Sequence, residues 1–144
     1  MRVYLDNCCY NRPFDGQDQA AVKLETDAKL LIQGLMRMGV VEYAWSFILR
    51  LESSRNPDPQ RKSAIQEWID GASVDVAPSD SIADRARELM MLGIKVADAL
   101  HLACAEQAEC DWFFTVDRGI LRKVNRLGAM RVANPVQFVL EGLT

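Results

Sequence analysis

The chain alternates short runs rich in β-branched and aromatic residues with longer stretches whose apolar residues recur at helical spacing. Strands separated by helices favour a parallel sheet covered on both faces, because parallel neighbours are joined by crossover connections that are usually helical. We therefore expect a three-layer α/β/α fold of one domain, residues 1–144, around a central, mainly parallel five-stranded sheet. The predicted strands span residues 2–6, 40–45, 74–76, 112–116 and 130–133.

Helices are predicted between these strands, where apolar residues repeat at three- and four-residue intervals. A cluster of Pro, Gly, Asn and Asp over residues 11–16 predicts a loop, and Ser46 is placed to cap the helix after the second strand. The predicted helices span residues 18–38, 47–55, 60–70, 79–91, 96–109, 120–127 and 136–140. In the first of them the periodic apolar residues are Val22, Leu24, Ala28, Leu31, Leu35 and Met38.

Composition bounds the class of protein. The 144 residues suffice for one hydrophobic core, and 49% hydrophobic with 26% charged residues is ordinary for a globular chain. A formal net charge of −3 gives no general sign of nucleic-acid binding, although it is compatible with a local basic patch. An acid at position 6 interrupts any apolar leader, and no apolar run is long enough to span a membrane. We expect a cytoplasmic protein with no membrane partner.

Four cysteines are present, and nothing about their spacing resembles a secreted disulfide scaffold. We expect Cys8, Cys9, Cys104 and Cys110 to be reduced and to pack as small apolar residues. A zinc site that combines Cys8, Cys9 and Cys104 with His101 is the less favoured interpretation, because the spacing matches no common zinc module.

Four acids stand where predicted elements begin or end. Asp6 closes the first strand and Asp117 the fourth, and ligands of parallel sheets bind beyond the carboxyl ends of the strands. Asp98 opens a predicted helix, and Glu52 lies in the helix that follows Ser46. Carboxylates brought together repel one another unless a cation lies between them. If these acids meet in the fold, they predict a divalent-metal site.

Each acid also has an ordinary structural interpretation. Asp6 is suited to a turn, Asp98 to a helix N-cap, and Asp117 to either. Glu52 fits a solvated helix position, and Glu42 competes with it for the same role but lies within a predicted strand. The joint pattern of the four favours the metal site over these single explanations.

Several other enzyme classes are excluded by missing residues. A haloacid-dehalogenase-type phosphatase needs a second Asp two residues after the first, and position 8 is Cys8. A receiver domain needs a lysine after a late strand, which is absent, and there is no glycine-rich phosphate loop. The single histidine, His101, lies beside Asp98, which favours a supporting or packing role over nucleophilic catalysis.

Three segments resemble the signature segments of the PIN-domain family. They are Val3-Tyr4-Leu5-Asp6-Asn7, Ala97-Asp98-Ala99-Leu100-His101-Leu102-Ala103 and Phe114-Thr115-Val116-Asp117. Residues 5–15 further resemble an uncharacterised prokaryotic branch of that family, and the likeness extends to Asn134-Pro135. PIN domains are α/β/α metal-dependent nucleases, and many are VapC-type ribonucleases, the toxins of toxin–antitoxin pairs.

By position, the resemblance makes Asp6, Glu52, Asp98 and Asp117 the catalytic, metal-holding acids. Thr115 matches the hydroxyl residue before the final acid, whereas Asn7 stands where a small hydroxyl residue is more usual. The resemblance thus implies an endoribonuclease that uses Mg²⁺ or Mn²⁺, an RNA substrate that Asn7 and Thr115 help to position, a small antitoxin partner and a homodimer. The alternative is a catalytically silent PIN-like module that binds RNA or protein.

The segment after Asp117 is basic, with no Asp or Glu from Arg118 to Leu140. Helical spacing predicts that Arg118, Arg122 and Arg126 share one face, which would guide phosphates toward the acids. A solvated helix face is the alternative. Arg12, in the loop after the first strand, is a second predicted phosphate contact.

Overall fold

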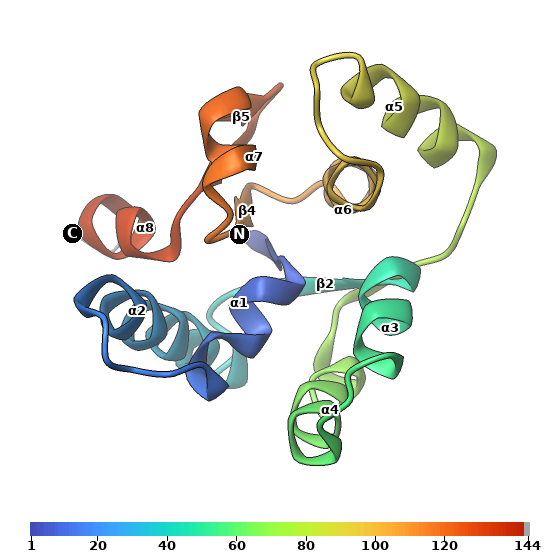
Figure 1. The fold of residues 1–144 in the computed structure, drawn as a ribbon. Coiled ribbons are helices and arrows are strands. Elements are labelled where there is room, and N and C mark those ends of the chain that lie inside the picture. The colour runs from blue at the N-terminus through green and yellow to red at the C-terminus, as the bar shows by residue number, and fades with distance from the viewer. Residues whose placement is uncertain (143–144) are drawn as a thin grey trace.

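A six-stranded sheet forms the centre of the computed structural model, which describes residues 1–142 (Figure 1). The strand order is β3-β2-β1-β4-β6-β5, and every neighbouring pair is parallel except β5 with β6. The strands are β1 (Arg2–Leu5), β2 (Glu42–Ser46), β3 (Val74–Val76), β4 (Trp112–Phe114), β5 (Arg126–Leu127) and β6 (Met130–Ala133). The predicted three-layer, mainly parallel fold is confirmed, with six strands in place of five.

The helices are α1 (Asn7–Asn11), α2 (Ala20–Arg37), α3 (Phe47–Ser54), α4 (Pro59–Gln66), α5 (Asp80–Met90), α6 (Val96–Gln107), α7 (Arg118–Lys123) and α8 (Pro135–Gly142). Two short 3-10 turns, η1 (Arg12–Phe14) and η2 (Ile69–Gly71), complete the set. Ser46 caps α3 as predicted, since its hydroxyl accepts from the amide of Leu49. Among residues 1–142, no helix is long and apolar enough to cross a membrane.

Two differences from the predicted elements bear on the site. The predicted helix 120–127 ends at Lys123, and the chain then turns into β5, which pairs with β6 around Gly128 at φ 60°. The structure also has α1, which begins directly after β1, ahead of the segment predicted as a loop. Asp6 explains this helix, because its side chain accepts a hydrogen bond from the amide of Asn7 and so acts as the N-cap.

The buried face of α2 differs from the periodic apolar residues of its sequence. Leu24, Leu31 and Met38 are 58%, 50% and 74% exposed. The helix instead buries a stripe at three- and four-residue spacing that contains polar side chains. This stripe consists of Val22, Thr26, Lys29, Gln33 and Met36, with Ala28 and Ile32 beside it.

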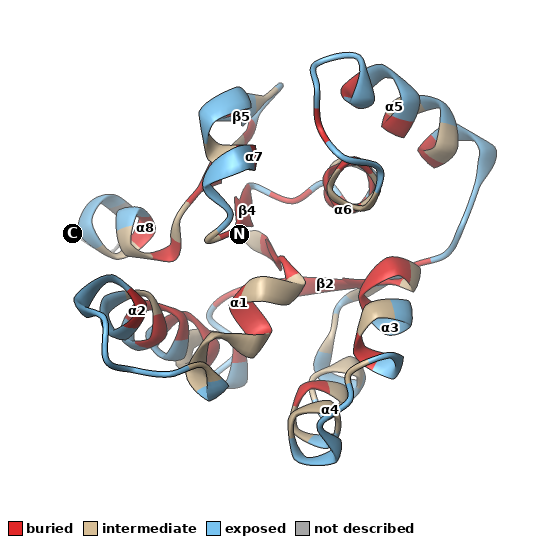
Figure 2. Ribbon diagram, viewed as in Figure 1, coloured by how far each residue is buried: buried red, intermediate tan, exposed pale blue. Residues whose placement is uncertain are grey.

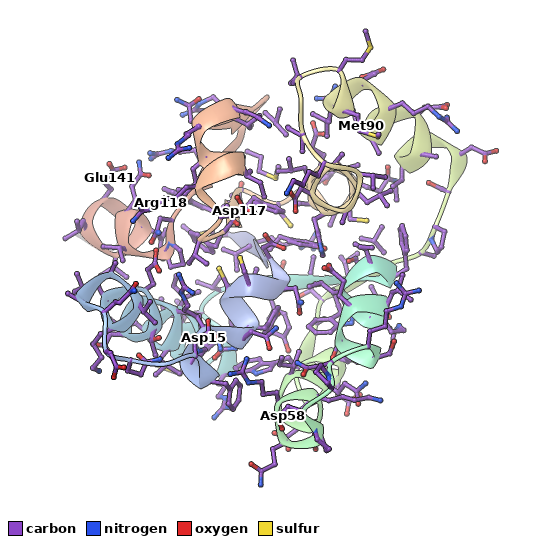
Figure 3. The ribbon with its side chains drawn as sticks, in the orientation of Figure 1. Asp15, Asp58, Met90, Asp117, Arg118 and Glu141 are labelled. Carbon is purple, nitrogen blue, oxygen red and sulfur yellow. The ribbon has the colours of Figure 1, made fainter. Side chains whose placement is uncertain are left out.

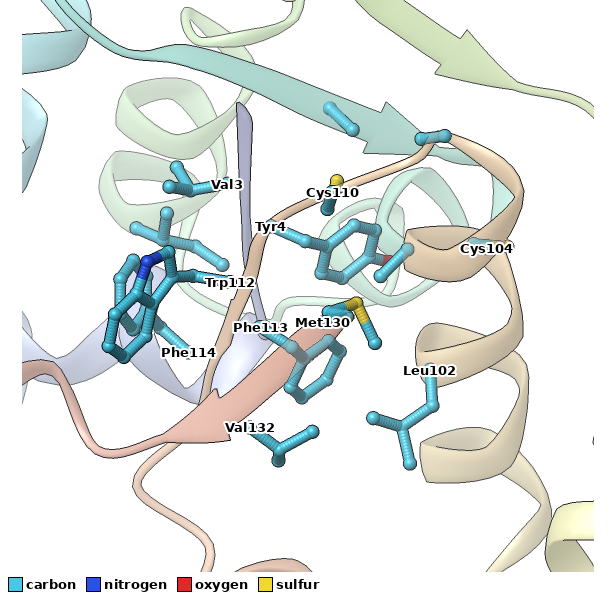
Figure 4. Packing of buried hydrophobic residues seen from close by; sticks show 14 of the residues in the cluster. Val3, Tyr4, Leu102, Cys104, Cys110, Trp112, Phe113, Phe114, Met130 and Val132 are labelled. Atoms are coloured by element: carbon cyan, nitrogen blue, oxygen red, sulfur yellow. The ribbon is translucent and has the colours of Figure 1, made fainter. Parts of the chain in front are cut away.

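The residues of the central strands are nearly all buried, and Figure 2 colours these buried segments red. Side chains alternate along β4, and Phe113 stacks with Tyr4 on the side of α6 (Figure 4). Trp112 and Phe114 point to the other side, where both contact Phe138 of α8. Strands buried on both faces carry continuous apolar runs, which is why β1 and β4 are legible in the sequence. The same topology brings the ends of β1 and β4 together.

Candidate metal centre

Asp6 is held firmly at the carboxyl end of β1. It is 5% exposed, and its backbone amide donates to the carbonyl of Phe114 at 2.9 Å, which ties it to β4. One carboxylate oxygen accepts from the amide of Asn7 at 2.8 Å, and the other accepts from the hydroxyl of Thr115 at 2.9 Å. Sequence reasoning placed Asp6 at this edge, and the structure adds that it caps α1.

Thr115 links the two strand-end acids. It is fully buried, and while its hydroxyl donates to Asp6 it accepts from the backbone amide of Asp117 at 3.1 Å. The exposed side chain of Asp117 caps α7, with Oδ1 accepting from the amides of Gly119 and Ile120 at 2.7 and 3.3 Å (Figure 3). Thr115 therefore acts by positioning its neighbours, because no part of it is accessible to a substrate.

Asp98 is the third residue of α6, and the N-cap position belongs to Lys95. The capping interpretation of Asp98 is therefore wrong. The pKa of the half-buried Asp98 is raised to about 6, chiefly by burial and then by the charges of Asp6, Asp117 and Glu52, with His101 acting in the opposite direction. The Asp98 carboxyl thus lies within electrostatic range of the other three acids.

Glu52 enters the site through a chain of buried polar groups. Its Oε1 hydrogen-bonds to Nε2 of His101, and that nitrogen lies 3.6 Å from Oδ1 of Asp6. On the far side of the ring, Nδ1 of His101 is 2.6 Å from the hydroxyl of Tyr4, which is 2.7 Å from the hydroxyl of Ser46. Burial lowers the pKa of His101, but the bond to Glu52 and the charge of Asp6 outweigh it, so the pKa is raised.

This contact corrects the interpretation of Glu52 as a solvated position. Its competitor Glu42 lies at the opposite, amino end of β2, where it is exposed and pairs with Arg2 at 3.2 Å. Sequence reasoning assigned His101 a supporting role but missed Tyr4 and Ser46. The available signal was that all three are polar residues inside apolar runs.

Four separate segments thus bring their acids to one edge of the sheet. As the side chains stand, no three carboxylate, imidazole or thiol groups in residues 1–142 converge closely enough to hold a metal ion. The less favoured zinc site is therefore not formed either, because Cys8, Cys9, His101 and Cys104 do not converge within residues 1–142. The chain's four cysteines, which include Cys110, are all free thiols. Carboxylates are the available hard donors, a set that suits Mg²⁺ or Mn²⁺ better than zinc.

The predicted basic face is only partly present. Arg118 and Arg122 lie exposed on α7, beginning immediately after Asp117, but Arg126 belongs to β5, so the three-arginine helical face is wrong. Arg12 is already paired with Glu25 at 2.8 Å and Asp15 at 3.1 Å. It would have to leave those ion pairs to contact a phosphate.

Asn7 lies at the first turn of α1, beside Asp6. Its side-chain oxygen accepts from Nδ2 of Asn11 at 3.3 Å, and its backbone carbonyl accepts from the same nitrogen at 3.0 Å. The structure therefore shows Asn7 next to the acids with its amide oxygen already engaged.

Comparison with known proteins identifies the family and the fold. A family model described as PIN domain matches residues 3–127. Among solved structures, the chain is similar to VapBC2 from Rickettsia felis bound to a DNA fragment from their promoter, with 16% identity and a TM-score of 0.57. That match covers 93% of this chain and 98% of the other, and at such identity it shows the fold alone. A search of curated proteins found no match. The matching family model spans most of the sequence and includes all four acids, Asp6, Glu52, Asp98 and Asp117. The chain therefore belongs to the PIN-domain family.

Proposed function

We propose that the protein is an endoribonuclease that depends on Mg²⁺ or Mn²⁺ and hydrolyses RNA phosphodiester bonds at Asp6, Glu52, Asp98 and Asp117. The observation that carries the proposal is the pair of buried links that join acids from distant segments. Thr115 joins Asp6 to the backbone of Asp117, and His101 lies between Glu52 and Asp6.

The donor set fits a hard divalent cation. Within residues 1–142, neither the carboxylate of Asp98 nor Oδ2 of Asp117 has a hydrogen-bond partner, so both are free to ligate. A bound ion of this type supplies a water of lowered pKa and neutralises charge that develops on the phosphoryl oxygens. Four acids in electrostatic range without such an ion repel one another, which is the cost that metal binding would remove.

The chain's own residues orient this site. Thr115 and the amide of Asn7 fix Asp6, and the chain from Ser46 through Tyr4 to His101 fixes Glu52. Such supporting partners typically contribute about 10–100-fold to metal affinity or activity. Arg118 and Arg122 are exposed on the helix that Asp117 caps, and in this proposal they bind phosphates of the RNA backbone.

The test is an RNA cleavage assay with Mg²⁺ or Mn²⁺, and with EDTA in excess, on the wild type and on Asp6→Asn and Asp117→Asn. We expect each variant to lose at least about 100-fold in rate. Asp58→Asn is the matched control, because Asp58 caps α4 as Asp117 caps α7, through the amides of Gln60 and Arg61. Asparagine is as good an N-cap as aspartate, so both cap variants should stay folded while only Asp117→Asn loses activity.

A folded wild-type protein that shows no metal-stimulated cleavage would overturn this proposal. It would favour the alternative of a PIN-like module that binds RNA or protein without cleaving it. Calorimetric titration of Mn²⁺ into the wild type and Asp6→Asn separates the two, since the alternative requires no carboxylate-dependent metal binding.

We further propose that the protein is the toxin of a toxin–antitoxin pair, acts in the cytoplasm as a homodimer and has a small antitoxin as its partner. The support is the family and the likeness to a fold neighbour described as VapBC2. Growth arrest on expression, absent with Asp6→Asn, and a dimeric mass by light scattering are the expected results. One cooperative unfolding transition would support the further proposal that residues 1–144 form a single domain.

A further inference from the structure

A cavity of about 180 Å³ lies among the α1–η1 segment, α2 and α4, and none of the four acids lines it. Figure 1 shows α1 between α2 and α4 on this side of the molecule. Its walls are largely apolar and aromatic, from Phe14, Leu30, Ile65 and Trp68. Cavities of about 150 Å³ accommodate a benzene ring, so this volume suits a small organic molecule.

Lys29 of α2 lines this cavity as a buried cation without a counter-ion. It is 4% exposed, and among residues 1–142 it has no ion pair and no side-chain hydrogen bond. Its nearest recorded partner is the face of the Tyr10 ring, with Nζ 5.7 Å from the ring centroid. A buried charge is costly unless it is paired, and no carboxylate among residues 1–142 pairs with Lys29 to offset that cost.

The electrostatic surroundings of Lys29 agree with this. Burial lowers its pKa to about 8, with a raising effect from Cys9 and a lowering effect from Arg37. The one acid in the cavity wall, Glu67, is exposed and is not among the groups that shift this pKa. The site therefore lacks an anion near the ammonium group.

Two further polar groups of the wall are also without partners. The amide nitrogen Nε2 of Gln33, one turn after Lys29, and the hydroxyl of Tyr10 are buried with no hydrogen-bond partner among residues 1–142. Elsewhere on the same face of α2 polar groups are satisfied, since Thr26 donates to the carbonyl of Arg12 at 3.2 Å. Unpartnered buried groups are rare in folded proteins, and two of the five recorded among residues 1–142 belong to residues that line this cavity.

We propose that this cavity binds a small organic acid, with its carboxylate at Lys29. The ammonium of Lys29 and the guanidinium of Arg37 are the cationic donors of the wall, the amide of Gln33 and the hydroxyl of Tyr10 are further donors that lie behind its surface, and a carboxylate is a pure acceptor that carries the missing negative charge. The aromatic walls would hold the apolar body of the acid against Trp68 and Phe14. An inorganic anion would accept hydrogen bonds from the donors but would bring no apolar group to contact these walls.

The test is calorimetric titration of the full chain with benzoate and phenylacetate, and with benzamide and phenylacetamide as neutral matches. We expect saturable one-to-one binding of the acids at neutral pH, at least about tenfold tighter than the amides, because a charge-assisted hydrogen bond is about twice as strong as a neutral one. Lys29→Met should abolish that preference, whereas Lys23→Met, on the exposed side of the same helix, should retain it. Gln33→Leu should weaken the acids more than the amides.

A second readout is specific to Lys29. At about pH 9 the free lysine is largely neutral, so binding of a carboxylate should take up a proton. Titrations in buffers of different ionisation enthalpy measure this uptake, which should be absent in Lys29→Met. The absence of saturable binding, equal affinity for acid and amide, or unchanged binding by Lys29→Met would each overturn the proposal in favour of a water-filled cavity.

Discussion

Replacing Lys29 with methionine is expected to stabilise the ligand-free protein at neutral pH. Burial lowers the pKa of this lysine from 10.5 to about 8. At about 1.36 kcal/mol for each pKa unit, keeping the ammonium charged in the folded state costs about 3 kcal/mol. Methionine is similarly long and unbranched but uncharged, so it should pack along the Tyr10 ring without that cost.

The effect has a defined pH dependence. Below pH 8 Lys29 is charged in both the folded and the unfolded protein, so the full cost is present. Between pH 8 and 10.5 the folded protein loses this proton first, and the destabilisation by Lys29 fades as the pH rises. Burial also raises the thiol pKa of Cys104 and of Cys110 to about 12, which has the opposite effect on stability above the unfolded thiol pKa of 9.0. Because both cysteines are present in the variant and in the wild type, their contribution cancels in the difference between the two free energies of unfolding.

Urea unfolding of the wild type and Lys29→Met, from neutral pH to about pH 10, measures this difference. The variant should be more stable by about 3 kcal/mol at neutral pH, and the gap should close toward the alkaline end. Lys23→Met is the control, because its side chain is 58% exposed and pairs with Asp27, so its change should stay within about 0.5 kcal/mol. A variant less stable than wild type at neutral pH, or a gap independent of pH, would refute the reasoning.

Two further predictions concern packing and the polar chain behind Glu52. Gly71→Ala should lower the free energy of unfolding by about 1–3 kcal/mol, because an added Cβ would collide with the hydroxyl of Tyr43. Gly34→Ala should raise it by about 0.5–1 kcal/mol, because Gly34 lies inside α2 with open space around it. Tyr4→Phe removes the hydroxyl that contacts His101 and should cost about 1–3 kcal/mol. Denaturant unfolding checks all three, and a neutral Tyr4→Phe would show that the buried chain contributes nothing to stability.

The parts of the fold that the sequence predicts are those with long, uniform signals. Central strands buried on both faces carry apolar runs such as residues 112–114, and these are legible without tertiary information. The hairpin strand β5 has two residues and depends on pairing with β6, so its sequence looks like the end of a helix. The five residues of α1 are too few for a periodic pattern, and their helix depends on the cap that Asp6 provides.

Some acids of the candidate site are predictable from the strand topology, and others depend on tertiary contacts. Asp6 and Asp117 follow from topology, since β1 and β4 are parallel neighbours whose carboxyl ends meet. Glu52 does not follow from any local pattern, because its place depends on a contact with His101 from a helix far along the chain. Buried polar chains of this type form only when tertiary packing satisfies every member, so their sequence signal is no more than a polar residue in an apolar run.

Helix α2 shows where a periodic pattern misleads. Its leucines predict a buried stripe that the structure leaves half exposed at Leu24 and Leu31, while Lys29 and Gln33 face inward. Burial of apolar area alone would rotate the helix the other way, since exposing two leucines and burying a charge both cost free energy. The observed rotation keeps Glu25 against Arg12 and Asn134, whose hydrogen bonds tie α2 to η1 and to the start of α8. These long-range polar contacts of Glu25 accompany the face that α2 buries, and that face leaves Lys29 unpaired, a cost that a bound carboxylate would relieve.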